Sequence, residues 1–223
     1  EEMEESLVEV RRDAKTIRNF TIPCQEFPFE FNGKILEIKK VGLVNGGEHT
    51  SKEVDIVLHR KTHLLLAGPN GSGKSTFLEK VSLGKAKGVT LGQGVSLGYY
   101  RQDFSGLAYE QTAYDSLWEV MEKKDDQALR SCAAGFLLDG KVLGHQIKNL
   151  SEGQKGLLML ARLVLLKPGL LILDEPTNHI NFRHLPGLAQ ALDLYEGAMI
   201  LVCHIPEFIS QIRIDETLDL GVE

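Results

Sequence analysis

The chain has 223 residues, a formal net charge of −6 and only three cysteines, Cys24, Cys132 and Cys203. Its length suits one α/β domain with an appendage, and its acidic balance argues against broad nucleic-acid binding by this portion, so any RNA contact has to be local. The scattered cysteines argue against a disulfide framework and favour a cytoplasmic location. No apolar run reaches membrane-spanning length, so we expect no membrane insertion.

Residues 1–32 are expected to precede the compact domain, which we place at residues 33–223. Charged side chains dominate residues 1 to about 20, where a loose apolar stripe predicts a mostly solvated helix. Pro23 and Pro28 then mark an extended connector. The first residue is Glu rather than Met, and we interpret the chain as a fragment of a longer polypeptide. A linker helix leaving another domain and a frayed chain end both fit these residues.

Two strands are expected at the start of the domain. The apolar alternation in residues 34–40 predicts the first, the apolar run in residues 54–58 predicts the second, and residues 42–51 between them are typical of a loop.

A phosphate-binding loop follows the apolar run at residues 64–67. It has the pattern G-x-x-x-x-G-K-S between a strand and a helix, the context that this motif requires, in the sequence Gly68-Pro69-Asn70-Gly71-Ser72-Gly73-Lys74-Ser75-Thr76. Glycines let backbone N–H groups turn toward phosphate oxygens, and the new helix points its positive end at them. Lys74 adds a charge at the β- and γ-phosphates, and the Ser75 hydroxyl suits Mg²⁺. The alternative is a glycine-rich turn that binds nothing.

Short strands and a helical subdomain are predicted next. β-prone runs at residues 89–91 and 95–100 are separated by glycines, and the second ends in Arg101-Gln102-Asp103. A helical region extends from about Gln111 to Lys148, and it predicts a helical subdomain at about residues 104–150 with no active site of its own.

A long helix is expected to begin in Leu150-Ser151-Glu152-Gly153-Gln154. Ser151 and Gln154 have the spacing of a capping box, in which each side chain bonds the other residue's backbone N–H. The helix is expected to stop at Lys167-Pro168-Gly169. A cap alone would explain this pattern; the strand that follows makes a functional role more plausible.

Asp174 and Glu175 end that strand, which consists of the apolar residues 170–173. The carboxyl edge of such a strand is where ligands of open α/β sheets bind, and burying carboxylates without a role is costly. Asp174 would hold Mg²⁺ through water, and Glu175 would orient and deprotonate the attacking water. A purely structural strand end is the alternative.

Another strand, at residues 198–202, should deliver Cys203 and His204 to the same edge. A histidine after a strand is more often structural than catalytic. Its position after the Asp174-Glu175 strand makes His204 a catalytic candidate, and residues 217–220 complete the sheet as an expected edge strand.

From about residue 34 to the end, the chain resembles the ATP-binding-cassette (ABC) ATPases. The resemblance rests on the order of its motifs: the P-loop, Gln102, the residue 150–154 signature, Asp174-Glu175 and His204. Residues 99–102, Gln154-Lys155 and residues 175–180 are similar to the ABC-F branch. The resemblance implies an ABC cassette of the P-loop NTPase class, with a RecA-like, mostly parallel sheet core, a small antiparallel β subdomain and an α-helical subdomain.

The resemblance also implies ATP and Mg²⁺ as ligands, held between this cassette and a second one. Lys74, Ser75, Gln102, Asp174, Glu175 and His204 would serve the cassette's own ATP, with Glu175, His204 and Gln102 in catalysis and Ser75, Gln102 and Asp174 at the metal. Ser151, Gly153 and Gln154 would serve the nucleotide of the partner cassette. Neither half would be complete alone.

ABC-F proteins have two cassettes and no membrane domain, and many act on ribosomes in translation or antibiotic resistance through a helical linker. By this resemblance the chain is the second cassette, residues 1 to about 22 are the end of the linker, and the ribosome or its rRNA is a partner. The same chemistry fits two alternatives, the ATPase subunit of a membrane transporter and a regulatory cassette that closes on ATP without useful turnover.

Four positions depart from the family pattern. Residues 41–63 contain no aromatic side chain to stack on adenine. Glu152 replaces the usual glycine of the signature, Asn181 replaces the expected Asp, and Ile205-Pro206 replaces the acidic and basic pair after His204. These departures predict weak base selectivity and two unequal sites.

Overall fold

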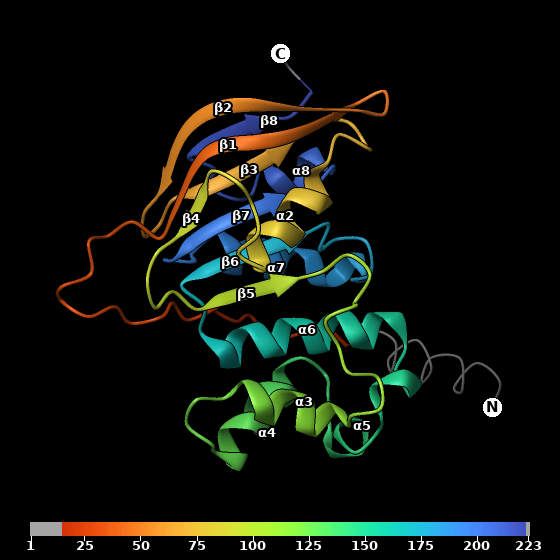
Figure 1. The fold of residues 1–223 in the computed structure, drawn as a ribbon. Helices are drawn as coiled ribbons and strands as arrows, with labels where there is room; N and C mark the ends of the chain where they lie inside the picture. Colours follow the sequence, from red (N-terminus) through yellow and green to blue (C-terminus); the bar gives the residue numbers. More distant parts are fainter. Residues whose placement is uncertain (1–14, 222–223) are drawn as a thin grey trace.

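The computed structural model describes residues 15–221, and Figure 1 shows their arrangement in layers. Within these residues a three-stranded antiparallel sheet lies at one end, a five-stranded parallel sheet in the middle and a group of helices at the other end. The predicted combination of a parallel core, a small antiparallel subdomain and a helical subdomain is therefore present.

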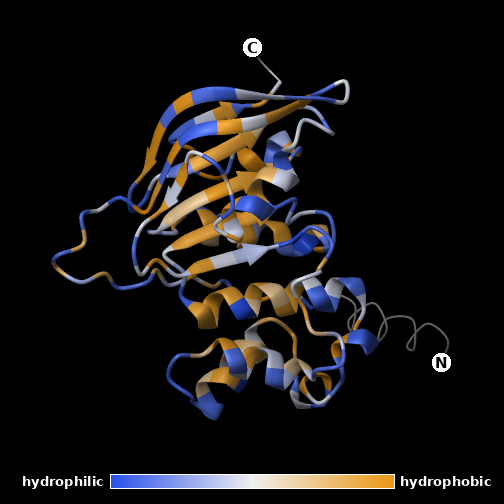
Figure 2. Cartoon of the chain, in the orientation of Figure 1, coloured by the Kyte–Doolittle hydropathy of each residue, from blue (hydrophilic) through white to orange (hydrophobic). Residues whose placement is uncertain are grey.

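The parallel sheet has the strand order β5-β6-β7-β3-β8. Its strands are β3 (His63–Ala67), β5 (Leu97–Tyr100), β6 (Leu170–Asp174), β7 (Ala198–Val202) and β8 (Glu216–Asp219). Every residue of β6 and β7 is buried, as apolar runs without alternation predict, and β8 is the expected edge strand. Figure 2 shows hydrophobic colours gathered on these inner strands.

Alternate residues of the central strands enter two separate hydrophobic cores. Leu171 and Leu173 pack in the core on the side of the helical group, whereas Leu170 and Ile172 pack in the core shared with the antiparallel sheet. Both faces are covered because successive side chains of a strand point to opposite sides.

The antiparallel sheet consists of β1 (Leu36–Asn45), β2 (Glu48–Leu58) and β4 (Val89–Leu91) in the order β2-β1-β4. The loop predicted at residues 42–51 is wrong: β1 and β2 continue through it as a hairpin in which Asn45 pairs with Glu48. Gly46 and Gly47 form the two-residue turn with φ of 57° and 90°, the positive values that such tight hairpin turns require.

The described helices are α2 (Lys74–Ser82), α3 (Ala113–Val120), α4 (Asp126–Gly135), α5 (Gly140–Leu143), α6 (Glu152–Leu166), α7 (Leu185–Asp193) and α8 (Pro206–Ile209), with the 3₁₀ turns η1 (Ile147–Asn149) and η2 (Phe182–His184). None of them is long and apolar enough to cross a membrane. The elements from α3 to η1 form the helical group. α6 lies between this group and the parallel sheet (Figure 1).

The segment before β1 differs from its prediction. The part of the expected helix that is described, from Lys15 onward, has no helical structure, and the rest lies outside the described residues. Ile17 and Ile22 are buried in the core beside the helical group, and the Gln25 side chain bonds Ser96 N and Gly94 O at 2.7 Å each. An extended chain anchored along the domain buries more apolar surface than a solvated helix would.

Candidate nucleotide-binding site

The P-loop connects β3 to α2, and glycines with positive φ shape its backbone. Gly73, directly before the first residue of α2, has a φ of 98°, and Gly68 has a φ of 136°. A Cβ atom on Gly68 would lie 3.0 Å from Ser72 Oγ and 3.3 Å from the backbone N of Gly221. Other residues adopt such φ values only with strain, so the loop conformation depends on glycine at both positions.

Lys74 lies folded along the loop that it follows. Its Nζ donates hydrogen bonds to Gly68 O at 2.5 Å and Pro69 O at 2.9 Å, and the residue is buried. Burial lowers the pKa of the Lys74 ammonium, and the carboxylates of Glu175 and Asp174 oppose that shift. An ammonium group that donates to two neutral carbonyls of its own loop can exchange them for an anionic ligand.

A cavity of about 470 Å³ lies over the loop and gathers most of the predicted site residues. Its lining includes Asn70, Gly71, Gly73, Lys74, Ser75, Thr76, Gln102, Asp174, Glu175 and His204. Gly68, Pro69 and Ser72 belong to the same loop without lining the cavity. The Ser72 hydroxyl is buried and finds no hydrogen-bond partner within the described part of the chain.

Three oxygen-bearing side chains, Ser75, Gln102 and Asp174, line one wall of this cavity and fit the predicted metal set. Burial raises the pKa of Asp174, while a hydrogen bond with Ser75 and the charge of Lys74 act in the opposite direction. A carboxylate, a hydroxyl and an amide oxygen are the hard ligands that Mg²⁺ accepts. The donor set therefore fits a magnesium ion.

Glu175 is held at the sheet edge in an uncommon backbone conformation. Its φ is 52°, and its backbone N donates to Val202 O at 2.9 Å, which ties the end of β6 to the end of β7. His204 Nε2 lies 2.9 Å from Glu175 Oε1. Burial raises the pKa of Glu175, and the nearby His204 opposes the shift. Strain of this kind, with a buried acid, is frequent in catalytic sites.

The signature residues lie apart from this cavity, at the start of α6. Ser151 Oγ accepts from Gln154 N at 3.1 Å, and Gln154 Oε1 accepts from Ser151 N at 3.0 Å, which confirms the capping box. Glu152 forms an ion pair with Lys155 at 3.0 Å. Gly153 follows Glu152 in the first turn of α6, and none of these residues lines the cavity.

We assigned no role to His179 from the sequence, although it lies in residues 175–180, the stretch that is similar to the ABC-F branch. Its Nε2 lies 3.1 Å from Gln102 O, and its Nδ1 lies 3.9 Å from Glu152 Oε2. Its ring also packs on Phe104, with a centroid distance of 4.9 Å. His179 thus connects the Gln102 segment with the signature helix, a long-range contact that residue spacing does not reveal.

The fold and the cavity define a P-loop nucleotide-binding domain. A sequence model of the ABC transporter family matches residues 51–178, and the chain belongs to this family, as its ATP-binding domain.

Two curated relatives illustrate the similarity. YdiF of Bacillus subtilis (strain 168), named as an ATP-binding protein, is 37% identical over 163 residues that make up 72% of this chain. ATP-binding cassette sub-family F member 2 of Mus musculus is 31% identical over 211 residues, 89% of this chain. The chain spans only 25% and 32% of the length of these two proteins.

Solved structures show the same fold. A dimeric bacterial ABC transporter cassette superposes with a TM-score of 0.65 and 19% identity, covering 83% of this chain and 95% of that one. A post-hydrolysis dimer of an ATP-binding cassette, bound to ADP and Pi, superposes with a TM-score of 0.61 and 19% identity, covering 79% of this chain and 90% of that one. The predicted ABC cassette fold is therefore confirmed.

Proposed function

We propose that this chain is the second, C-terminal cassette of an ABC-F type protein, which binds Mg·ATP and hydrolyses it while closing against a partner cassette. The observation that carries the proposal is the single cavity that brings Lys74, Asp174, Glu175 and His204 together over the P-loop. The similarity to a sub-family F member over 89% of the chain supports the ABC-F assignment.

Some residues of the cavity bind the nucleotide and its metal ion, and others act in hydrolysis. Lys74 exchanges its carbonyl contacts for phosphate oxygens, since a charge-assisted bond is stronger than a neutral one. Ser75, Asp174 and Gln102 would hold Mg²⁺, which when bound would neutralise charge on the phosphates. Glu175 takes a proton from the attacking water, because burial has raised its pKa toward the working pH.

His204 and the signature residues 151–154 have the remaining roles in this proposal. His204 contacts Glu175 Oε1 and orients that carboxylate. The N-terminus of α6, capped by Ser151, offers backbone N–H groups, including that of Gly153, to the γ-phosphate of the partner's nucleotide, and Gln154 supports the cap. Two cassettes are then needed for two complete sites.

Two experiments test the proposal. Single-turnover hydrolysis of Mg·ATP by the cassette pair should be measurable, and a cassette pair that binds ATP without hydrolysing it would instead be regulatory. Cosedimentation of the full-length Glu175→Gln protein with ribosomes in ATP tests the cellular target. We expect cosedimentation with ATP and not with ADP, and its absence would contradict the ribosome partner that the ABC-F resemblance implies.

A further inference from the structure

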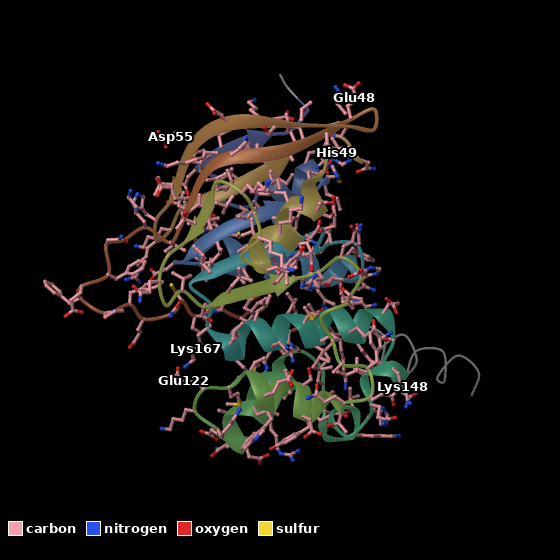
Figure 3. All side chains as sticks on the ribbon, viewed as in Figure 1. Glu48, His49, Asp55, Glu122, Lys148 and Lys167 are labelled. Carbon is pink, nitrogen blue, oxygen red and sulfur yellow. The ribbon has the colours of Figure 1, made fainter. Side chains whose placement is uncertain are left out.

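A second cavity lies beside the P-loop, between the β1–β2 hairpin and α2. Its volume is about 510 Å³. From the hairpin, Lys40, residues 42–44 and residues 49–51 line the cavity, α2 contributes Phe77 and Lys80, and the loop before β4 contributes residues 85–87. Figure 3 shows His49, one of the lining residues, at the hairpin end. We call this cavity the basic groove.

The charged side chains that line the basic groove are all lysines. Lys40, Lys80, Lys85 and Lys87 all line it, together with His49, and no carboxylate among the described residues lines it. All four lysines are exposed, and none forms an ion pair within residues 15–221. In a chain with a net charge of −6, four unpaired ammonium groups around one cavity form a local anion-attracting surface.

The basic groove is continuous with the nucleotide cavity. Val44, Gly73 and Thr76 line both. A nucleotide that places its 5′ phosphates on the P-loop therefore extends past these three residues toward the lysines. A neutral base can accept hydrogen bonds from few of the four ammonium groups. A phosphate can accept charge-assisted hydrogen bonds from several of them.

We propose that the basic groove binds an additional phosphate carried on the ribose of the nucleotide, so that the cassette prefers a nucleotide phosphorylated on its ribose hydroxyl as well as at its 5′ end. The inference rests on the proposed function, because the 5′ triphosphate has to occupy the P-loop. Lys85 and Lys87 belong to the short loop between α2 and β4, and both are exposed and line the groove, so each can approach a phosphate there.

Isothermal titration calorimetry with three probes tests the proposal: ATP, ATP carrying a 3′-phosphate and ATP carrying a 2′-phosphate, each with Mg²⁺. For one of the two ribose-phosphorylated probes we expect binding about tenfold tighter than ATP at low salt, since two charge-assisted contacts are added. The gain should shrink as salt rises, because exposed charges are screened.

Lys85→Gln with Lys87→Gln should abolish the gain while leaving ATP affinity within about twofold of the parent, because these lysines lie outside the P-loop. Lys123→Gln with Lys124→Gln, on the helical group, is the matched control and should retain the gain. Equal affinity for all three probes in the parent would overturn the inference, as would a gain that survives the groove substitutions. Failure of ATP itself to bind would instead contradict the proposed function.

Discussion

His204 Nε2 lies 2.9 Å from Glu175 Oε1, across the ends of the two neighbouring strands β7 and β6. The histidine side chain is half exposed, whereas the glutamate side chain is 9% exposed, so the contact reaches a buried acid from the open side of the cavity. The Glu175 carboxylate also accepts a hydrogen bond from the His204 backbone, so His204 contacts it with both its ring and its main chain. Substitution of Glu175 can therefore test whether this acid acts in ATP hydrolysis or in ATP binding.

Glu175→Gln should reduce single-turnover ATP hydrolysis by roughly 10²–10⁴-fold, because the amide keeps the shape of the side chain but cannot take a proton. ATP binding should survive, and the ATP-bound cassette pair should last longer, since a negative charge beside the γ-phosphate is removed. Rapid-quench hydrolysis and size-exclusion of cassette pairs measure the two effects. Glu207→Gln, an exposed acid on α8, is the control. Near-parental hydrolysis would exclude Glu175 as the base.

Lys74→Ala should abolish tight ATP binding, because the backbone N–H groups of the loop cannot alone compensate the phosphate charge. Calorimetric titration with Mg·ATP measures the effect, and Lys123→Ala provides an exposed control. Unchanged affinity would contradict the assignment of the phosphate site.

Base selectivity should be weak. Residues 41–63 contain no aromatic side chain, and Val44 is the residue of this segment that lines both cavities. A stacking contact typically contributes about 1–3 kcal/mol per base, so its absence leaves little to distinguish adenine from guanine. Competition between ATP and GTP should give affinities within tenfold of each other. A larger preference for ATP would mean that another residue reads the base.

Local sequence motifs predict where most residues of the candidate site lie, whereas contacts between distant segments cannot be predicted from such motifs. The P-loop pattern, the capping box at Ser151 and the acids after β6 each depend on neighbours in sequence, and the structure places them as those patterns indicate. The β1–β2 hairpin was missed because polar residues 45–51 obscure its strand pattern, although the adjacent Gly46-Gly47 was a usable turn signal. The contacts of His179 and the grouping of lysines in the basic groove depend on packing between distant segments.

His179→Ala should raise the Mg²⁺ concentration needed for half-maximal hydrolysis by roughly three- to tenfold, because an interaction of 0.5–1.5 kcal/mol that holds the Gln102 backbone is lost. ATP binding without Mg²⁺ should not change. His145→Ala, an exposed histidine on the helical group, is the control. His179→Gln, whose amide can donate to the Gln102 carbonyl, should restore part of the Mg²⁺ response. Equal Mg²⁺ curves for His179→Ala and the parent would exclude this positioning role.

Asp174→Asn should stabilise the nucleotide-free protein while weakening the Mg²⁺-dependent part of ATP binding. Burial raises the pKa of Asp174 above its ordinary value, so the folded state favours the neutral form, and an amide removes the cost of burying the charge. The same change removes a carboxylate from the proposed metal ligands. Thermal unfolding without nucleotide and ATP titration with and without Mg²⁺ should therefore respond in opposite directions.

The pH dependence gives the second half of this prediction. The pKa of Asp174 is higher in the folded than in the unfolded state, so the folded state binds more protons. The contribution of Asp174 to the free energy of unfolding therefore rises as the pH falls from the folded pKa toward the unfolded value of about 3.9. Above the folded pKa the contribution is constant and unfavourable. Asp174→Asn should therefore raise the melting temperature at pH 7 by a few degrees and by less near pH 4. An equal shift at both pH values would mean that the gain does not come from the buried charge of Asp174.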